Sequence, residues 1–374
     1  MRAGLYLHVP FCRRKCPYCD FFSLPVSDPP VEEYLRALKK ELELRREELE
    51  GLVFTTFYVG GGTPSLLPPW FYEELFSFLA GRLSFAPEER TLEANPEGLT
   101  PSLLKEYRLL FNRLSLGAQS FSPEGLRVLG RLHTVEQTKE AVLRAQEAGF
   151  QNLSLDLIFA WPGQTVEMLA REIEEALSLA PEHLSCYELT VEPGTPFEQA
   201  FRRGTLRKPR EEEILAMFSL LWERLAAAGF EHYEISNYAR PGRRCLHNLF
   251  YWRAEPYLGL GAGAASFLGG RRTKNLEDLK GYLSALEQGR RPVGEEEELD
   301  SEALFREAVV LGLRLREGVL RRELRERFGF DLAQYYAREI PFLEARGLVH
   351  WDGERLRLTA RGLLLANVVF RELV

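Results

Sequence analysis

The sequence predicts an α/β protein: a partial (β/α)6 TIM-like barrel followed by a small helical, winged-helix-like domain. Three observations lead to this fold class. Six apolar segments alternate with segments of helical periodicity between residues 5 and 228. Residues that could bind a ligand or take part in a reaction follow the ends of these apolar segments, as they do at the carboxyl end of a TIM-type barrel. From Ser301 the alternation stops, and helices lead into a short hairpin.

The six predicted strands are short apolar runs that end at glycine, proline or polar residues. They cover residues 5–9, 55–59, 91–94, 113–120, 153–158 and 184–191. Helical spacing follows them at 31–50, 69–79, from 101, at 134–148, from 166 and at 211–228. Because strands and helices alternate, we expect a parallel sheet with right-handed crossovers.

The remaining chain predicts two further parts. We assign residues 1–230 to the barrel, 231–295 to a cap or extension and 296–374 to the helical domain. The glutamate-rich stretch 294–300 is interpreted as a linker. Helices are expected at about 301–316, 320–328 and 332–346, then a hairpin at 348–358 with an Asp-Gly turn, and a last helix from Thr359.

Composition limits the class of protein. The chain has 374 residues, with 45% hydrophobic and 28% charged residues, which is ordinary for a globular protein. No apolar run is long enough to span a membrane, and the first strand begins so early that we expect no signal peptide. Unpaired thiols then indicate the cytoplasm. The net charge of -7 argues against bulk affinity for nucleic acid.

Three of the five cysteines, Cys12, Cys16 and Cys19, lie within eight residues directly after the first predicted strand. Three thiolates can hold three irons of a cubane cluster and leave the fourth iron open for a ligand. Ordinary core thiols and a zinc site are the alternatives. Zinc would need a fourth ligand, and His8 is the only imidazole nearby. The spacing therefore favours an iron–sulfur site with three cysteine ligands.

The segment Gly60–Pro64, which reads Gly-Gly-Gly-Thr-Pro, follows the second predicted strand. Backbone without side chains can approach a small ligand and offer its polar groups to the ammonium or carboxylate of an amino acid. Taken alone, the segment is typical of a plain tight turn. Its place after a cluster-binding loop favours a turn that binds the amino-acid part of a cofactor.

Polar residues near the ends of the next strands are weaker signals. Glu93, Gln119, Arg131 and Asp156 could each be a surface pair or a helix cap. Asp156 is the most unusual, because it lies between two leucines of an apolar strand, where an unpaired carboxylate is costly. The hydroxyl groups of a ribose would satisfy it.

A second dense group of residues is His247-Asn248-Leu249-Phe250-Tyr251-Trp252. Imidazole can ligate haem iron, and the aromatic residues can stack on a flat macrocycle. The alternative is an aromatic core segment with one hydrogen-bonded histidine. Three nearby arginines could pair with propionates, and Cys245 is either a second candidate ligand or an inert thiol. The arginines are Arg243, Arg244 and Arg253.

The Cys-x3-Cys-x2-Cys pattern resembles the radical S-adenosylmethionine (SAM) superfamily. Together with the glycine turn, Glu93, the segment 113–121, Arg131 and Asp156, the chain resembles the oxygen-independent coproporphyrinogen III oxidase family over nearly its whole length. This resemblance implies a [4Fe-4S] cluster on the three cysteines and SAM at its open iron. It also implies that Tyr18 packs beside the cofactor and that SAM contacts Tyr6, Gly61, Gly62, Thr63, Glu93, Gln119, Arg131 and Asp156.

Two departures from the oxidase matter. Phe21 stands where the oxidase carries a fourth cysteine, and the oxidase has a longer segment before its cysteines. Both features, with the HNxxYW segment, are similar to the haem-chaperone branch of the family. That branch implies haem bound through His247, transfer to an acceptor protein, and room for an electron donor.

Two alternative functions stay open at this point. The first is oxygen-independent coproporphyrinogen III oxidation, in which a radical SAM enzyme decarboxylates its substrate to protoporphyrinogen IX. The second is a radical SAM enzyme that acts on RNA, suggested only by the winged-helix-like end of the chain. The departures disfavour the oxidase, and the acidic balance disfavours RNA. Whether the protein is an enzyme is left undecided by the sequence.

Overall fold

Six parallel strands form the centre of one twelve-stranded sheet in the computed structural model, which describes all residues from Met1 to Val374. Their order is the order of the chain, and each pairs in parallel with the next. The strands are β1 (Arg2–Val9), β4 (Val53–Gly61), β5 (Ser84–Ala94), β6 (Arg113–Gln119), β7 (Leu153–Phe159) and β8 (His183–Glu188). The predicted partial (β/α)6 barrel is therefore confirmed.

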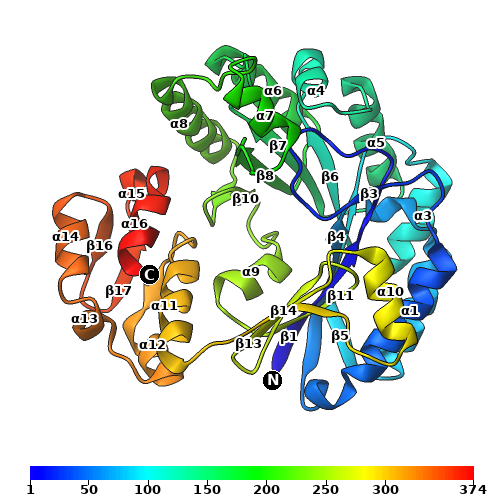
Figure 1. The fold of residues 1–374 in the computed structure, drawn as a ribbon. Helices are drawn as coiled ribbons and strands as arrows, with labels where there is room; N and C mark the ends of the chain where they lie inside the picture. The colour runs from blue at the N-terminus through cyan, green and yellow to red at the C-terminus, as the bar shows by residue number, and fades with distance from the viewer.

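Helices cover the outer face of this curved sheet (Figure 1). Threonines begin several of them: Thr100, Thr134 and Thr165 each accept a backbone N–H with the side-chain oxygen, which satisfies a donor that has no partner within the helix. The helices are α1 (Val31–Leu44), α2 (Pro69–Ala80), α3 (Pro101–Leu110), α4 (Pro123–Val128), α5 (Val135–Glu147), α6 (Val166–Ser178), α7 (Pro196–Arg202) and α8 (Glu211–Ala227). Their apolar faces and the strands share a core of 56 buried residues.

Two very short strands shape the segment after β1. β2 (Phe11–Cys12) pairs in parallel with β3 (Leu24–Pro25), so the chain between them forms a closed loop. We call residues 10–26 the cysteine loop. Further backbone hydrogen bonds close its ends, from Leu24 to Pro10 at 2.7 Å and from Val26 to Cys12 at 2.9 Å.

Residues 231–298 extend both edges of the sheet. β10 (Asn237–Ala239) and β9 (Glu231–His232) continue beyond β8, and β11 (Tyr257–Leu260) pairs in parallel with β1. Beyond β11 follow β12 (Ala265–Leu268), β13 (Arg271–Asn275) and β14 (Val293–Glu298), with α10 (Leu279–Glu287) between the last two. The helix α9 (Leu246–Trp252) packs against β1 and β4. The domain boundary that the sequence analysis places at residue 231 stays a prediction.

The glutamate run was expected to be a linker, and this expectation is wrong. Residues 293–298 are the edge strand β14. Cross-strand ion pairs explain why a strand can carry this much charge: Arg271 meets Glu296, and Arg272 meets Glu297 at 3.0 Å. A partner more than twenty residues away supplies the cations, which the local composition does not reveal.

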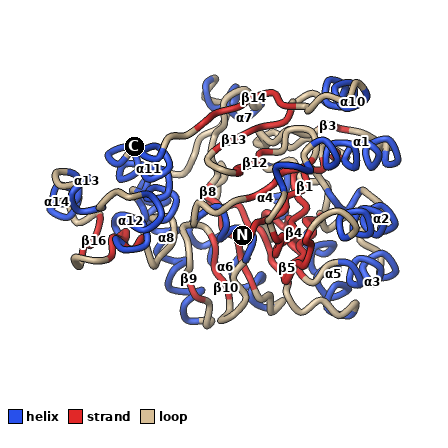
Figure 2. Tube along the Cα trace, turned by 90° about the horizontal axis from the view of Figure 1, so that it is seen from below, coloured by secondary structure: helices blue, strands red, loops and turns tan.

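Residues 299–374, here called the C-terminal module, have a separate core of 18 buried residues. Figures 1 and 2 show the module beside the sheet, and Trp222 of α8 packs against the core of the module. Its elements are α11 (Ser301–Gly312), β15 (Val319–Leu320), α12 (Arg321–Phe328), α13 (Leu332–Tyr335), α14 (Glu339–Ala345), β16 (Val349–Trp351), β17 (Arg355–Leu358), α15 (Ala360–Leu364) and α16 (Ala366–Leu373).

The predicted hairpin is confirmed, because Asp352 accepts the backbone N–H groups of Glu354 and Arg355 in the turn between β16 and β17. The helix predicted at 332–346 is instead divided into α13 and α14. The buried side chain of Tyr336 lies at the break and donates its hydroxyl to Leu373 O at 2.7 Å. None of the helices in the chain combines the length and the apolar character that crossing a membrane requires.

Candidate functional site

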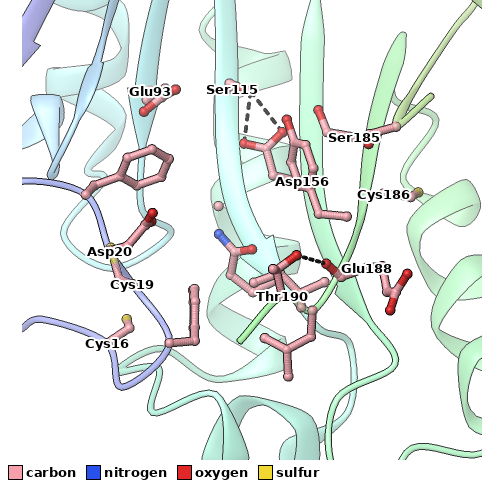
Figure 3. A pocket seen from close by; sticks show the side chains of 18 of the residues that line it. Cys16, Cys19, Asp20, Glu93, Ser115, Asp156, Ser185, Cys186, Glu188 and Thr190 are labelled. Carbon is pink, nitrogen blue, oxygen red and sulfur yellow. Dashed lines mark hydrogen bonds between the residues drawn. The ribbon is translucent and has the colours of Figure 1, made fainter. Parts of the chain in front are cut away.

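The carboxyl ends of the parallel strands open into a cavity of about 790 Å3. The cysteine loop forms one wall, and Figure 3 shows Cys16, Cys19 and Asp20 across from Asp156, with Glu93 above the loop. Residues 363–368 of the C-terminal module line it as well. Small-molecule sites usually measure about 300–1,000 Å3, so the cavity is large enough for a cofactor and part of a second ligand.

Polar side chains hold two of the three predicted cluster cysteines. Thr63 donates its hydroxyl to Cys12 Sγ at 3.6 Å, and Arg131 donates to Cys16 Sγ at 3.3 Å. Asn95 joins these two donors, because its amide nitrogen donates to Thr63 Oγ1 at 3.1 Å and its amide oxygen accepts from Arg131 at 2.5 Å. The ends of β4 and β5 and the loop after α4 therefore converge on the cysteine loop.

The donor set fits an iron–sulfur cluster better than a single metal ion. The thiols of Cys12, Cys16 and Cys19 line the same cavity, yet nowhere do three cysteine, histidine or acidic side chains converge closely enough for one ion. In a cubane cluster, each cysteine binds a different iron, so three spread thiols suit it. Burial raises the pKa of Cys12, and that of Cys19 to about 11, so cluster binding at neutral pH would release protons.

The glycines after β4 are required by the approach of the cysteine loop. A Cβ atom on Gly62 would lie 2.5 Å from Phe11 O, and Gly61 has a positive φ of 108°. The N–H of Gly62 donates to Val9 O at 2.8 Å, and that of Thr63 to Phe11 O at 2.7 Å. These two N–H groups are therefore already bonded, and His8 and the cysteine loop occupy the space where the Cβ atoms of Gly61 and Gly62 would lie. The turn would therefore offer a ligand its carbonyl groups.

Two carboxylates lie inside the barrel beside the cavity. Tyr58 donates its hydroxyl to Glu93 Oε1 at 2.7 Å, and burial, with Asp156 nearby, raises the pKa of Glu93 to about 7. Asp156 accepts from Ser115 at 3.2 Å and from Ser154 at 3.4 Å, and burial raises its pKa (Figure 3). Both carboxyl groups would gain from a cationic or hydroxyl-bearing ligand.

Gln119, the last residue of β6, has a positive φ of 62°, which is unusual for a residue other than glycine. The side chain lines the cavity. Strained backbone of this kind is often retained at binding sites, because the surrounding structure holds it in place. The conformation supports a binding role for Gln119.

The structure gathers most of the predicted site residues around the cavity. Its lining includes Cys12, Cys16, Tyr18, Cys19, Gly61, Gly62, Thr63, Glu93, Gln119, Arg131 and Asp156. Tyr6 is not part of this lining. Its hydroxyl bonds to His8 Nδ1 at 3.0 Å, and His8 Nε2 bonds to Phe22 O at 2.8 Å. Tyr6 therefore holds the ring of His8, which in turn holds the cysteine loop.

His247 also lies outside the lining, buried in the interior of the sheet. Only 1% of its surface is exposed, and its ring stacks on Tyr58 with the centroids 5.2 Å apart. Both ring nitrogens are bonded: Nδ1 to Thr56 and Nε2 to Tyr251, each at 2.8 Å. Burial lowers its pKa to about 3, so the imidazole is neutral. In this conformation no nitrogen of His247 is free to ligate iron.

The other residues predicted around His247 point elsewhere. Cys245 is buried and lies 3.6 Å from Glu89 Oε1. Arg244 pairs with Glu231, and Arg253 pairs with a glutamate of the C-terminal module. None of these three residues lines the cavity, and neither does Arg243.

Several cavity residues were given no individual role in the sequence analysis, among them Asn95, Asn248 and Arg314. Asn95 follows Glu93 at the end of β5, and this position was a usable signal because neighbouring strand ends share one edge. Asn248 and Arg314 lack such a signal. They come from α9 and from the C-terminal module, and only the folded chain brings them to the cavity.

Two family models match this chain. The radical SAM superfamily model matches residues 6–176, which include the second half of β1, the cysteine loop and the strand ends described above. The HemN C-terminal domain model matches residues 299–365, within the C-terminal module.

Several curated relatives match over nearly their full length. The heme chaperone HemW of Lactococcus lactis is 38% identical over 369 residues, which cover 98% of this chain and 96% of the relative. The heme chaperone HemW of Bacillus subtilis is 37% identical over 368 residues, covering 98% and 97% respectively. Among solved structures, the coproporphyrinogen III oxidase HemN of Escherichia coli superposes with a TM-score of 0.86 at 24% identity, covering 99% of this chain and 89% of that one. At this identity, the last comparison establishes the shared fold.

Proposed function

Because the chain belongs to the heme chaperone HemW family and has a radical SAM domain, we propose that it is a cytoplasmic haem chaperone. It would bind a [4Fe-4S] cluster, SAM and haem, and pass the haem to an acceptor protein. The observation that carries this proposal is the cavity, which three thiols, two partly buried carboxyl groups and part of the C-terminal module share.

Cys12, Cys16 and Cys19 would hold the cluster, and a cluster with three protein ligands leaves one iron free for a further ligand. Arg131 and Thr63 donate to two of the sulfurs, which stabilises them as thiolates. Tyr18 packs against Phe197 at the end of the cysteine loop, so it can flank a bound cofactor.

The remaining cavity residues have complementary roles toward SAM. Glu93, with a pKa of about 7, can accept from an ammonium group. Asp156 and Gln119 present hydrogen-bonding groups that suit ribose hydroxyls and an amino-acid carboxylate. Gly61 and Gly62 line the cavity, and their backbone carbonyl groups can accept from the ammonium group of the ligand.

His247 is the proposed iron ligand of the haem, and the structure defines what ligation through it requires. Tyr251 must give up its hydrogen bond to Nε2 before this nitrogen can meet iron. The Tyr251→Phe variant removes that bond and keeps the aromatic ring, so it should bind haem at least as tightly as the wild type. His247→Ala should weaken or shift the Soret band.

The function is tested on anaerobically reconstituted protein. Haem binding is followed by the Soret band, and turnover of coproporphyrinogen III to protoporphyrinogen IX is assayed in parallel with SAM and a reductant. We expect haem binding without turnover, because Phe21 replaces the fourth cysteine of the oxidase.

Two outcomes would contradict different parts of the proposal. Robust conversion of coproporphyrinogen III would show that the protein is the oxidase and not a haem chaperone. An unaltered haem spectrum in both His247→Ala and Tyr251→Phe would remove the ligand assignment while leaving haem binding in place.

A further inference from the structure

We propose that Arg314, supported on the ring of Trp252, binds a propionate carboxylate of the haem inside the cavity. This inference deepens the proposed haem-binding function and rests on it. It concerns the acidic edge of the macrocycle and does not depend on which side chain ligates the iron.

The position of Arg314 is fixed by the junction between the C-terminal module and the sheet. It lies in the turn after α11, where Leu315 forms a β-bridge with Glu234 and the N–H of Arg316 donates to Tyr233 O at 3.0 Å. The guanidinium carbon lies 4.1 Å from the centre of the Trp252 ring. An aromatic face at this distance holds an arginine in place while leaving its donors free.

The guanidinium lacks full hydrogen bonding in the folded chain. Its buried Nε has no partner, and the nearest carboxylate oxygen, Glu234 Oε2, is 3.8 Å from Nη2, beyond hydrogen-bond distance. Glu234 Oε2 itself has no hydrogen-bond partner either. Burial lowers the pKa of Arg314, which shows that Glu234 and the other neighbours do not fully compensate the charge.

The surroundings of Arg314 suit a flat, mainly apolar ligand with an acidic edge. Arg314 is the one charged residue that the C-terminal module contributes to the cavity lining. The other contributions are Leu363, Leu364, Leu365, Ala366, Asn367 and Val368, mostly apolar. Asn248 of α9 adds an amide that can donate to a second carboxylate oxygen.

This arrangement gives the last residue of the HNxxYW segment a specific task. Trp252 does not line the cavity, but it holds Arg314, which does. The arginines next to the segment cannot take this role in the same way, since Arg253 is 45% exposed and pairs with Glu317 at 3.6 Å. Arg253 is therefore a matched control.

The test compares the binding of haem with that of haem dimethyl ester, whose propionates are blocked. Each is titrated into the full-length protein with its cluster reconstituted, and binding is followed by the Soret band. Arg314→Gln should weaken haem binding about ten- to a hundredfold, the usual effect of losing a charge-assisted hydrogen bond, and should leave binding of the ester nearly unchanged. Trp252→Leu should weaken haem binding in the same selective manner, and Arg253→Gln should not.

The carboxylate of SAM is the other possible source of this chemistry, so calorimetric titration with SAM forms a second arm. Unchanged SAM affinity in Arg314→Gln is expected; a loss confined to SAM would overturn the inference. Equal losses for haem and its ester, or an equal effect of Arg253→Gln, would also overturn it. If the wild-type protein bound no haem at all, the proposed function would fail, and this inference with it.

Discussion

The imidazole of His247 lies stacked on the phenol ring of Tyr58, and the hydroxyl of Tyr58 donates to Glu93 at the edge of the cavity. The side chain of Tyr58 thereby links His247 of the HNxxYW segment to the cavity. Its neighbour Asn248 lines the cavity directly. The segment thus forms part of the barrel interior, and haem chemistry at His247 has to be compatible with that packing.

The first prediction concerns the cluster. Substituting any one of Cys12, Cys16 or Cys19 by alanine should abolish the [4Fe-4S] cluster, because each supplies one of three protein ligands. Iron and sulfide content and the electron paramagnetic resonance spectrum of anaerobically purified protein are the measurements. Cys186→Ala and Cys245→Ala are the controls and should keep the cluster. Stoichiometric zinc in place of iron and sulfide would contradict the assignment.

The second prediction concerns Asp156. Asp156→Ala should weaken SAM binding about ten- to a hundredfold, the range expected for one lost charge-assisted hydrogen bond, and should leave the cluster in place. Calorimetric titration measures the affinity. Glu188 is a matched control, since it is also a cavity carboxylate but is paired with Lys208 at 2.9 Å. Equal affinity in wild type and Asp156→Ala would show that Asp156 is only a partner of its serine neighbours.

The third prediction concerns pH and Glu93. Its pKa is about 7 in the folded protein and near 4.5 when unfolded, so the folded state holds an extra proton between these values. Stability from this group is complete below pH 4.5 and is lost as the pH rises through 7. Glu93→Gln should therefore stabilise the cofactor-free protein by about 2–3 kcal/mol at pH 8 and hardly at all at pH 4.5.

Urea unfolding at the two pH values measures this difference. Glu88→Gln is the control, because Glu88 lies on the same strand with its side chain 64% exposed. A Glu93→Gln effect of the same size at both pH values would mean that packing, and not ionisation, is responsible.

The fourth prediction concerns Gly62. Gly62→Ala should displace the cysteine loop, because the added Cβ would lie 2.5 Å from a backbone oxygen of that loop. We expect a destabilisation of about 1–3 kcal/mol and a reduced cluster content after reconstitution. Gly81→Ala is the matched control: its Cβ would find no atom closer than 3.5 Å and its φ is -80°, so the substitution should be tolerated. Full cluster occupancy in Gly62→Ala would contradict this prediction.

The parallel strands and the cavity lining could be predicted because their signals are local. A strand buried on both faces reads as an apolar run, as in Leu153–Phe159, and the polar residue that interrupts it, Asp156, then stands out. Strand ends meet at one edge, so residues far apart in the chain, such as Thr63 and Gln119, could be assigned to one site before the fold was known.

The remaining features depend on contacts that no local pattern records. His247 has the chemistry of a metal ligand, but Thr56 and Tyr251 occupy its two nitrogens. Arg314 reaches the cavity because a bridge between Glu234 and Leu315 places its turn there. The glutamates of β14 were misread for the same reason, since their arginine partners lie on another strand.

The position of β14 at the end of the twelve-stranded sheet has a consequence for self-association. An edge strand exposes backbone N–H and C=O groups that could pair with a second chain, and proteins often prevent this with charge. Glu295, Glu296, Glu297 and Glu298 stand in a row on this edge, all of them exposed. Arg271 and Arg272 pair with two of these glutamates, whereas Glu295 and Glu298 form no ion pair. Two such edges side by side would bring these unpaired carboxylates together, so charge repulsion disfavours β-pairing between two copies of the chain.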